Sequence, residues 1–241
     1  MKLRVCHLYP EHLNIYADRG NMAVLTHRCE WRGISCRIDG CGPGDPLPEA
    51  DLYYLGGGQD RDQRLIAPDL LLRAGDLAAA VAGGAAVLGV CGGYQLLGHV
   101  YRGHQGDEMP GIGLVDLETT AGPTRMIGNV VLRCELEPGR RRTLVGFENH
   151  AGRTRLGRGL SPLGQVVHGH GNNGEDGGEG VRDGRVVGTY VHGPLLPKNP
   201  WLADWLIQTA LEHRKGHVEL EPLDDTLERE AQRVAEALAA R

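Results

Sequence analysis

The chain has 241 residues, of which 41% are hydrophobic, so it is long enough for one large α/β domain or for one domain with an appendage, and it can bury a sizeable core. Its formal net charge is −5 and no basic stripe runs through it, which argues against nucleic acid or an anionic membrane surface as a partner. Six cysteines occur without a C-x-x-C pair, a secretory signal or an apolar run of membrane-spanning length, so we expect a cytosolic protein with free thiols.

The first ninety residues alternate short apolar segments with helical stretches. We predict strands at residues 3–9, 34–38, 51–55 and 85–90. A helix is predicted from about 21 to 31, and another from 62 to 81 with interruptions near Pro68 and Gly75. Such alternation is typical of βαβ units, and it predicts an α/β fold with a flavodoxin-like, mostly parallel sheet flanked by helices.

After residue 98 the hydrophobic pattern changes to short alternating segments bounded by turns. They are expected to form an antiparallel extension beside the parallel sheet, with strands at residues 114–117, 129–136, 144–148 and 163–167. Residues 169–180 are so rich in glycine that we expect a loop without a packed element, forming a mobile rim of the active site or of a partner interface.

The last third returns to one strand and two helices. A strand is predicted at residues 186–191, and Asn199-Pro200 predicts the start of a helix with Trp201, Leu202, Trp205 and Leu206 on one face. A final helix from about 225 carries Leu227, Ala231, Val234 and Leu238 at helical spacing. These faces are expected to be core more often than docking surfaces. We divide the chain into a main domain, 1–213, and a C-terminal helical extension, 214–241.

The most informative local motif is Gly89-Val90-Cys91-Gly92-Gly93, which directly follows an apolar strand. It is the cysteine form of the nucleophile elbow, in which a sharp strand-to-helix turn needs small neighbours and exposes the nucleophile above the sheet edge. The N-terminus of the following helix favours the thiolate, which is the reactive form of cysteine. The alternative is a small buried cysteine in a glycine-tolerant turn.

Two further segments supply what a thiolate nucleophile needs. His192 follows the predicted strand 186–191, at the sheet edge where open α/β sheets place their sites, and is the best candidate for a general base. The Gly56-Gly57-Gly58 turn also follows a strand, and its backbone N–H groups with that of Gly92 can form an oxyanion hole. A plain tight turn explains the three glycines about equally well.

Taken together, these motifs resemble the class I glutamine amidotransferase family, and within it the cobyric-acid-synthase-like branch. The resemblance rests on Leu55-Gly56-Gly57-Gly58-Gln59-Asp60, on residues 89–95 and on Thr189-Tyr190-Val191-His192-Gly193. Residues 8–10, 14–21, 146–150 and 171–177 narrow it to the GatD family of glutaminase subunits of lipid II isoglutaminyl synthases. It covers nearly all of residues 3–213 and implies the class I glutamine amidotransferase fold.

The resemblance implies roles for individual residues. Cys91 would attack the side-chain amide of L-glutamine, with His192 as the acid and base. Gly57, Gly58 and Gly92 would hold the oxyanion. Gln95 matches a substrate-contacting glutamine. Arg125 matches an arginine that contacts the substrate in the family, and its guanidinium group can bind both oxygens of an α-carboxylate. An ordinary surface arginine explains this residue equally well.

Two absences suggest that a partner completes the machinery. Most class I enzymes carry a glutamate two residues after the histidine, where this chain has Pro194, so His192 needs another orienting acid. Glu148 is one candidate and an acid from a partner chain is the other. No G-x-x-x-x-G-K-[ST] motif occurs, so no cofactor is expected on this chain. The resemblance implies a heterodimer with a MurT-like, Mur-ligase-type subunit that holds ATP and magnesium and amidates D-glutamate in lipid II, at the inner face of the membrane.

Several alternatives remain open at this level. The chain could serve a cobyric-acid-type amidation, act as a stand-alone cysteine hydrolase on the same fold, or be a catalytically silent binding subunit. His168, His170, Glu175 and Asp176 could also be read as a metal site. Their glycine-rich flanks make a rigid ligand cage improbable, so no metal is assigned.

Overall fold

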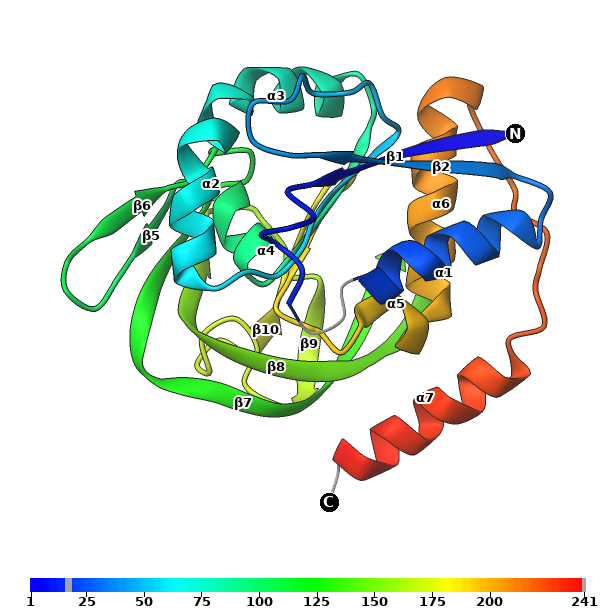
Figure 1. Ribbon diagram of the computed structural model, residues 1–241. Coiled ribbons are helices and arrows are strands. Elements are labelled where there is room, and N and C mark those ends of the chain that lie inside the picture. Colours follow the sequence, from blue (N-terminus) through cyan, green and yellow to red (C-terminus); the bar gives the residue numbers. More distant parts are fainter. Residues whose placement is uncertain (16–18, 240–241) are drawn as a thin grey trace.

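The computed structural model describes residues 1–15 and 19–239. Its first sheet has six strands in the order β11-β12-β4-β3-β1-β2, all parallel except the edge strand β11 (Figure 1). The mostly parallel α/β sheet predicted from the sequence is confirmed. The strands are β1 (Lys2–Leu8), β2 (Ser35–Cys41), β3 (Leu52–Leu55), β4 (Ala86–Val90), β11 (Val181–Asp183) and β12 (Val186–Thr189).

Helices cover both faces of this sheet, which is why its central strands are apolar on both sides. Leu52 and Tyr54 of β3 join a core cluster with α1 (Arg19–Glu30) and α6 (Pro200–Lys215). Their neighbours Tyr53 and Leu55 join the opposite cluster with α2 (Asp60–Leu72), α3 (Ala74–Ala82) and α4 (Gly92–Leu97). The short helix α5 (Leu195–Lys198) precedes α6.

The interrupted helix predicted for 62–81 is two helices, and the break at Arg73 confirms the interruption expected near Gly75, whereas the one expected near Pro68 is wrong. Pro68 is inside α2, and the chain turns where the Arg73 guanidinium donates to Asp69 Oδ2 (2.7 Å) and to the carbonyl of Gly42 (2.8 Å). These bonds tie the break to the loop at Gly42, and they set its exact residue, which a local sequence pattern does not give.

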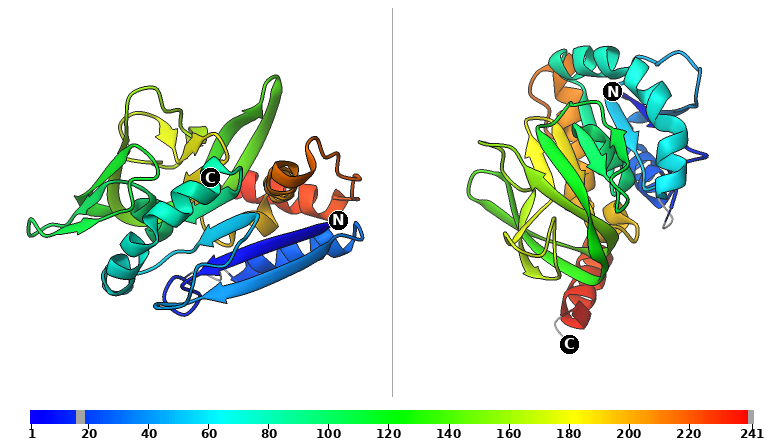
Figure 2. Two further views of the ribbon diagram at one scale, coloured as in Figure 1. Left: turned by 90° about the horizontal axis from the view of Figure 1, so that it is seen from above. Right: turned by 90° about the vertical axis from the view of Figure 1, so that its left-hand side faces the viewer.

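The second sheet is antiparallel for most of its length and is built around two long strands. It contains β5 (Val100–Arg102), β6 (Glu108–Pro110), β7 (Leu117–Glu137), β8 (Arg140–Leu156), β9 (Gly164–His168) and β10 (Gly178–Glu179). Figure 2 shows its green and yellow strands gathered apart from the blue and cyan elements. The antiparallel extension is confirmed, and the strand expected at 163–167 is β9. Residues 129–136 and 144–148 are strand as expected, but they are parts of the much longer β7 and β8. Residues 114–116 are loop instead of strand, and β5 and β6 were not expected.

Residues 169–177 are turn and loop, as expected, but six of the twelve residues in 169–180 are buried and Gly178–Glu179 forms β10. The expectation of a segment without a packed element is therefore wrong at its end, and the mobile rim stays a prediction. Asn172 and Asn173 are buried, and Asn172 pairs with Gly180 through both its amide nitrogen (2.8 Å) and its amide oxygen (2.9 Å). Glu179 at the end of the segment is also fully buried. These side-chain amides add to backbone hydrogen bonds of the segment, such as that from the N–H of Asn172 to the carbonyl of Gly178 (2.9 Å), and together they hold the glycine-rich chain in place.

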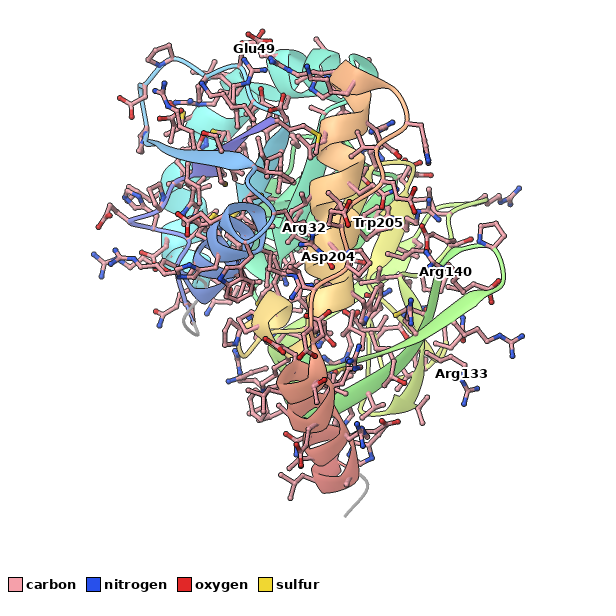
Figure 3. All side chains as sticks on the ribbon, turned by 90° about the vertical axis from the view of Figure 1, so that its right-hand side faces the viewer. Arg32, Glu49, Arg133, Arg140, Asp204 and Trp205 are labelled. Carbon is pink, nitrogen blue, oxygen red and sulfur yellow. The ribbon has the colours of Figure 1, made fainter. Side chains whose placement is uncertain are left out.

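The C-terminal elements include α6 and α7 (Thr226–Ala239), and the final helix is confirmed. Asn199 precedes α6 as expected, although its side chain bonds Val145 instead of capping the helix. Buried Arg28 bonds both Asp204 of α6 (2.6 Å) and Asp225 just before α7 (2.7 Å), and Arg32 also bonds Asp204 (Figure 3). The division at residue 213 stays a prediction, and α6 continues past it to Lys215.

The two C-terminal helices differ in what they bury. Leu202 and Leu206 of α6 are core, with Trp201 and Trp205 half-buried against it, as expected. On α7 the leucines at 227 and 238 and Val234 remain 77%, 52% and 54% exposed, so the expectation of a core face is wrong there. None of the described helices is long and apolar enough to cross a membrane.

Candidate active site

The predicted nucleophile elbow is confirmed as a local structure. Cys91 stands between β4 and α4 with φ 49° and ψ −104°, one of two described non-glycine residues with positive φ. Its N–H donates to the carbonyl of Thr189 (2.8 Å), and the N–H of Gly93 donates to the carbonyl of Gly56 (3.0 Å). A Cβ on Gly93 would overlap the carbonyl of Leu55, so the turn closes only with a glycine there.

Strand register brings the other catalytic segments to the same edge. Thr189 of β12 pairs with Val90 of β4, and Leu55 of β3 pairs with Gly89, so all three strands end together. The residues that follow them are the glycine turn 56–58, Cys91 and the segment leading to His192. This edge is the carboxyl end of parallel strands, where ligands bind in open α/β sheets.

The second sheet holds His192 from the other side. The N–H of His192 donates to the carbonyl of Phe147 in β8 (2.8 Å), and the N–H of Phe147 donates to the carbonyl of His192 (3.1 Å). Burial, with smaller effects from nearby His150 and Arg125, lowers the pKa of His192 to about 3. The imidazole is therefore neutral near pH 7, as a base that accepts a thiol proton must be.

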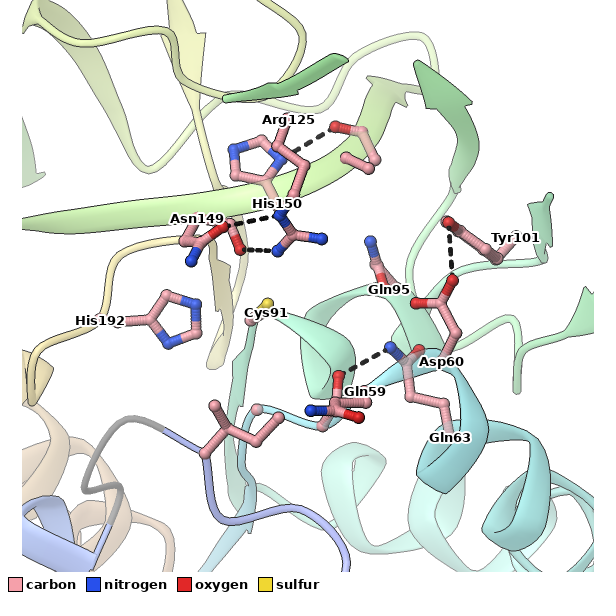
Figure 4. A pocket seen from close by; sticks show the side chains of 15 residues that line it. Gln59, Asp60, Gln63, Cys91, Gln95, Tyr101, Arg125, Asn149, His150 and His192 are labelled. Atoms are coloured by element: carbon pink, nitrogen blue, oxygen red, sulfur yellow. Dashed lines mark hydrogen bonds between the residues drawn. The ribbon is translucent and has the colours of Figure 1, made fainter. Parts of the chain in front are cut away.

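These groups meet in a cavity of about 600 Å³ between the two sheets (Figure 4). Of the seven residues singled out in the sequence, Cys91, His192, Gly57, Gly58, Gln95 and Arg125 line it. Gly92 adjoins it, because a Cβ on Gly92 would lie 3.0 Å from the nitrogen of Gly58. Its lining also includes residues to which the sequence assigned no role: Ile15, Gln59, Asp60, Gln63, Tyr101, Asn149, His150, Ala151 and Gly152.

The glycine turn is fixed by its neighbours. The carbonyl of Gly57 accepts from the N–H of Ile15 (3.0 Å), and the carbonyl of Gly58 accepts from Gln63 Nε2 (3.1 Å). In a trans peptide the N–H points opposite to the preceding carbonyl, so the bond from Ile15 also orients the N–H of Gly58. The turn is held in one conformation before any substrate binds, which is what preorganised oxyanion donors require.

A hydrogen-bond chain orients Gln95. Its Nε2 donates to the Tyr190 hydroxyl (3.1 Å), which bonds Thr154 Oγ1 (2.7 Å), and Thr154 bonds Thr119 (2.7 Å). The Tyr190 ring stacks on His150 with centroids 3.6 Å apart and planes 4° apart. With its nitrogen committed to Tyr190, Gln95 can turn its Oε1 to a ligand as an acceptor.

Arg125 reaches the cavity from an irregular part of β7. The pairing of β7 with β8 shifts between Ala121 and Met126, and such a bulge re-aims a side chain. Arg125 Nε and Nη2 donate to Asn149 Oδ1 and to the carbonyl of Asn149, both at 2.8 Å. Nη1 takes part in neither bond, so a fixed guanidinium edge remains for an anionic ligand.

Glu148, proposed as an orienting acid, anchors a neighbouring segment. Its Oε1 accepts from the N–H (2.6 Å) and Nδ1 (2.7 Å) of His170, and its Oε2 accepts from the N–H of Gly171 (3.0 Å). Burial acts to raise the pKa of Glu148, but these bonds and His150, whose Nε2 is 3.8 Å away, hold it below its usual value. The carboxylate is thus ionised and next to a lining histidine, while a role toward His192 stays a proposal.

In the part of the chain that the structure describes, no group of three or more His, Cys, Asp and Glu side chains is arranged to hold a metal ion. His168 and His170 stand close in sequence, but His170 is committed to Glu148.

Comparison with known proteins places this cavity in a family. Residues 4–200 match the CobB/CobQ-like glutamine amidotransferase domain. The lipid II isoglutaminyl synthase (glutamine-hydrolyzing) subunit GatD of Staphylococcus aureus is 37% identical over 97% of this chain and 94% of its own length. The Streptococcus pneumoniae subunit of the same name is 38% identical over 95% and 88%. Cobyric acid synthase of Paracoccus denitrificans is 34% identical over 78% of this chain but only 37% of its own length.

Solved structures agree on the fold. PurLQS from Thermotoga maritima superposes with a TM-score of 0.57 at 21% identity, covering 88% of this chain and 97% of that one. A crystal structure of a glutamine amidotransferase gives a TM-score of 0.59 at 17% identity, covering 85% and 98%. Together with the elbow cysteine and the histidine at one sheet edge, these matches establish that the chain belongs to the CobB/CobQ-like glutamine amidotransferase family.

Proposed function

We propose that the chain is the glutaminase subunit of a lipid II isoglutaminyl synthase. It hydrolyses L-glutamine and supplies ammonia to a MurT-like, Mur-ligase-type partner, which amidates D-glutamate in lipid II to D-isoglutamine during peptidoglycan synthesis. The observation that carries the proposal is the shared cavity of Cys91, His192 and the glycine turn 56–58, in a chain similar to GatD subunits over almost its whole length.

The first half-reaction forms a thioester. His192 takes the thiol proton of Cys91, and the thiolate attacks the side-chain amide carbon of glutamine. The N–H groups of Gly57, Gly58 and Gly92 would stabilise the negative oxygen of the tetrahedral intermediate. As the carbon–nitrogen bond breaks, His192 returns its proton to the leaving nitrogen, and ammonia departs.

The second half-reaction releases glutamate. Water attacks the thioester carbon while His192 accepts one of its protons, and the carbon–sulfur bond then breaks. Cys91 leaves as a thiolate and recovers the proton from His192, so the net change is glutamine plus water to glutamate plus ammonia. Arg125 would bind the α-carboxylate and Gln95 the side-chain amide during both steps.

The partner would supply what this chain lacks. We place ATP and magnesium, which activate the acceptor carboxylate, on the Mur-ligase-type subunit of a heterodimer. The acid that orients His192 would be Glu148 or a carboxylate of that subunit. This role would keep the chain in the cytoplasm, at the inner face of the membrane when the partner holds lipid II.

A second candidate is a glutaminase for cobyric-acid-type amidation. It is favoured by the similarity to cobyric acid synthases, but this chain spans only 37% of the Paracoccus enzyme, against 94% and 88% of the two GatD subunits. A stand-alone cysteine hydrolase of the same fold ranks third, because Gln95 and the Tyr190-Val191-His192-Gly193 motif point to glutamine chemistry.

The deciding experiment is ammonia release from L-glutamine by the purified chain, alone and with the Mur-ligase-type subunit, beside Cys91→Ala. We expect release that Cys91→Ala abolishes, and conversion of lipid II D-glutamate to D-isoglutamine when the partner, ATP and magnesium are present. The absence of ammonia release in both preparations would contradict the proposed glutaminase activity. Release without lipid II amidation would leave the glutaminase standing and favour the cobyric-acid-type acceptor, which the same assay can then offer.

A further inference from the structure

The charged side chains of the cavity form an opposed pair. Among the described lining residues, Arg125 is the sole arginine or lysine and Asp60 the sole carboxylate. We propose that Asp60 binds the α-ammonium group of L-glutamine while Arg125 takes its α-carboxylate, so that the pair selects a free L-amino acid. This inference rests on the proposed glutaminase function and names a further specificity-determining residue for it.

Asp60 is placed for this role by the turn that precedes it. It is the first residue of α2 and follows the glycine turn and Gln59 directly, so the oxyanion donors and the carboxylate belong to one rigid segment. Tyr101 donates a long hydrogen bond (3.4 Å) to Asp60 Oδ2. No other side-chain hydrogen bond reaches Asp60 from residues 1–15 and 19–239, so Oδ1 is open to a ligand.

Asp60 and Arg125 come from different layers but surround one space. In Figure 4 the Gln95 side chain lies between them, with Cys91 deeper in the same cavity. Both groups affect the hydroxyl of Tyr101. Burial raises the pKa of this hydroxyl to about 12; Asp60 acts to raise the pKa further, and Arg125 acts to lower it. Both charged side chains thus line the same cavity as Tyr101 and act on its hydroxyl with opposite charges.

The chemistry of the ligand explains why two opposite charges are useful. In a free amino acid the ammonium and carboxylate groups are separated by one carbon, so an Asp–Arg pair can bind both groups at the same time. A glutamine inside a peptide has neither charge, and a D-glutamine presents them exchanged. Each mismatch removes a charge-assisted contact at one end of the ligand, and this loss lowers the affinity for that ligand.

The alternative explanation is that Asp60 stabilises the start of a helix. Acidic residues in the first turn favour the helix dipole, and Asp62 shares that turn. Two residues along a helix turn a side chain by roughly 200°. Asp62 accordingly is not part of the cavity lining, and it provides the matched control.

The test compares two ligands that differ in the α-ammonium group alone, L-glutamine and glutaramate (4-carbamoylbutanoate). We would measure kcat/KM for both in the full chain with its partner subunit, for the native protein, Asp60→Asn and Asp62→Asn. Binding of both ligands to Cys91→Ala, with and without Asp60→Asn, gives a second readout that needs no turnover.

We expect Asp60→Asn to lower kcat/KM and affinity for L-glutamine about ten- to a hundredfold while leaving those for glutaramate within about twofold. Asp62→Asn should change neither. Equal losses for both ligands would mean that Asp60 is structural, and an unchanged value for L-glutamine would mean that it does not touch the substrate. Either result overturns the inference while the native activity still stands, whereas a native protein silent toward L-glutamine sinks the proposed function itself.

Discussion

The two sheets contribute different sets of residues to the same cavity. The parallel sheet delivers Cys91, the glycine turn 56–58 and the segment that leads to His192, all from strand ends that lie in register. The antiparallel sheet delivers Arg125, Asn149 and His150, and it fixes the backbone of His192 through Phe147. The groups proposed for the reaction therefore follow strands of the first sheet, whereas the proposed substrate contacts come from both sides: Gln95 and Asp60 from helices beside the first sheet, and Arg125 from the second.

This division is physical. The elbow depends on close backbone approach, so it requires glycines at fixed positions and a packed helix above them. Arg125, by contrast, sits on a long, bulged strand, where a side chain can be re-aimed without disturbing the pairing on either side. Substitutions beside the first sheet should accordingly lower kcat or stability, whereas substitution of Arg125 in the second sheet should raise KM.

The largest effect is expected at His192. His192→Asn should lower kcat for ammonia release about 10³- to 10⁴-fold, because no other base would remove the Cys91 proton. His168→Asn, on an exposed position of β9, should keep full activity and serves as the control. Steady-state ammonia release and the rate of Cys91 alkylation by iodoacetamide both measure this. Activity above a tenth of the native value would remove His192 from the mechanism.

The next prediction compares how one glycine substitution in each region changes the free energy of unfolding. Gly93→Ala should lower the free energy of unfolding by about 3 kcal/mol, because the added Cβ meets the rigid carbonyl of Leu55. Gly128→Ala in β7 places its Cβ where no heavy atom lies within 4 Å, so it should change stability by less than about 0.5 kcal/mol. Urea unfolding of the two variants gives the comparison. Equal stabilities would show that the elbow tolerates a side chain.

A third substitution tests recognition from the second sheet. Arg125→Gln should raise KM for L-glutamine about ten- to a hundredfold with a small change in kcat, since it removes a charge-assisted contact away from the reacting carbon. Arg133→Gln, on the exposed side of the same strand (Figure 3), should leave both parameters unchanged. A fall in kcat at constant KM would instead assign Arg125 to the chemical step.

The smallest effect concerns Glu179, whose carboxyl group bonds the N–H of Tyr190 (2.6 Å) and the hydroxyl of Thr189 (2.9 Å). Burial raises its pKa from 4.5 to about 8. The native chain thus keeps a proton that the unfolded chain has lost, so this contribution to stability is complete below pH 4.5 and is lost as the pH rises toward 8.

The window from pH 6.5 to 8 isolates this group. His7 and His192 have pKa values lowered from 6.5 to about 4 and about 3, so their contributions are present above pH 6.5 and are lost as the pH falls. The native free energy of unfolding should fall by roughly 2 kcal/mol across the window, and that of Glu179→Gln should stay nearly flat. Parallel curves would show that Glu179 is already ionised in the native protein.

The sequence identified the reactive parts of the molecule because their signals are local. Strands β3 and β4 are continuous apolar runs, and the elbow around Cys91 is formed by five consecutive residues. The motif resemblance linked the segments 55–60, 89–95 and 189–193, and strand register then brought their ends together.

The features that the sequence did not predict depend on contacts between residues that are far apart in the chain. The break between α2 and α3 is set by the Arg73 ties, and the order of residues 169–180 is set by paired asparagine side chains and by buried Glu179. Strands β5 and β6 are too short to carry a periodic signal. Asp60, Asn149 and His150 stood inside quoted motifs, yet nothing local distinguished them from residues that support a turn or a strand.

The sequence by itself thus determined the sheet, the nucleophile, the base and the family, because glycine spacing and apolar periodicity act over a few residues. Only the tertiary structure decided which charges face the ligand. That choice depends on the bulge in β7, on the first turn of α2 and on the pairing of Phe147 with His192, and together these bring Asp60, Arg125 and His192 into one cavity.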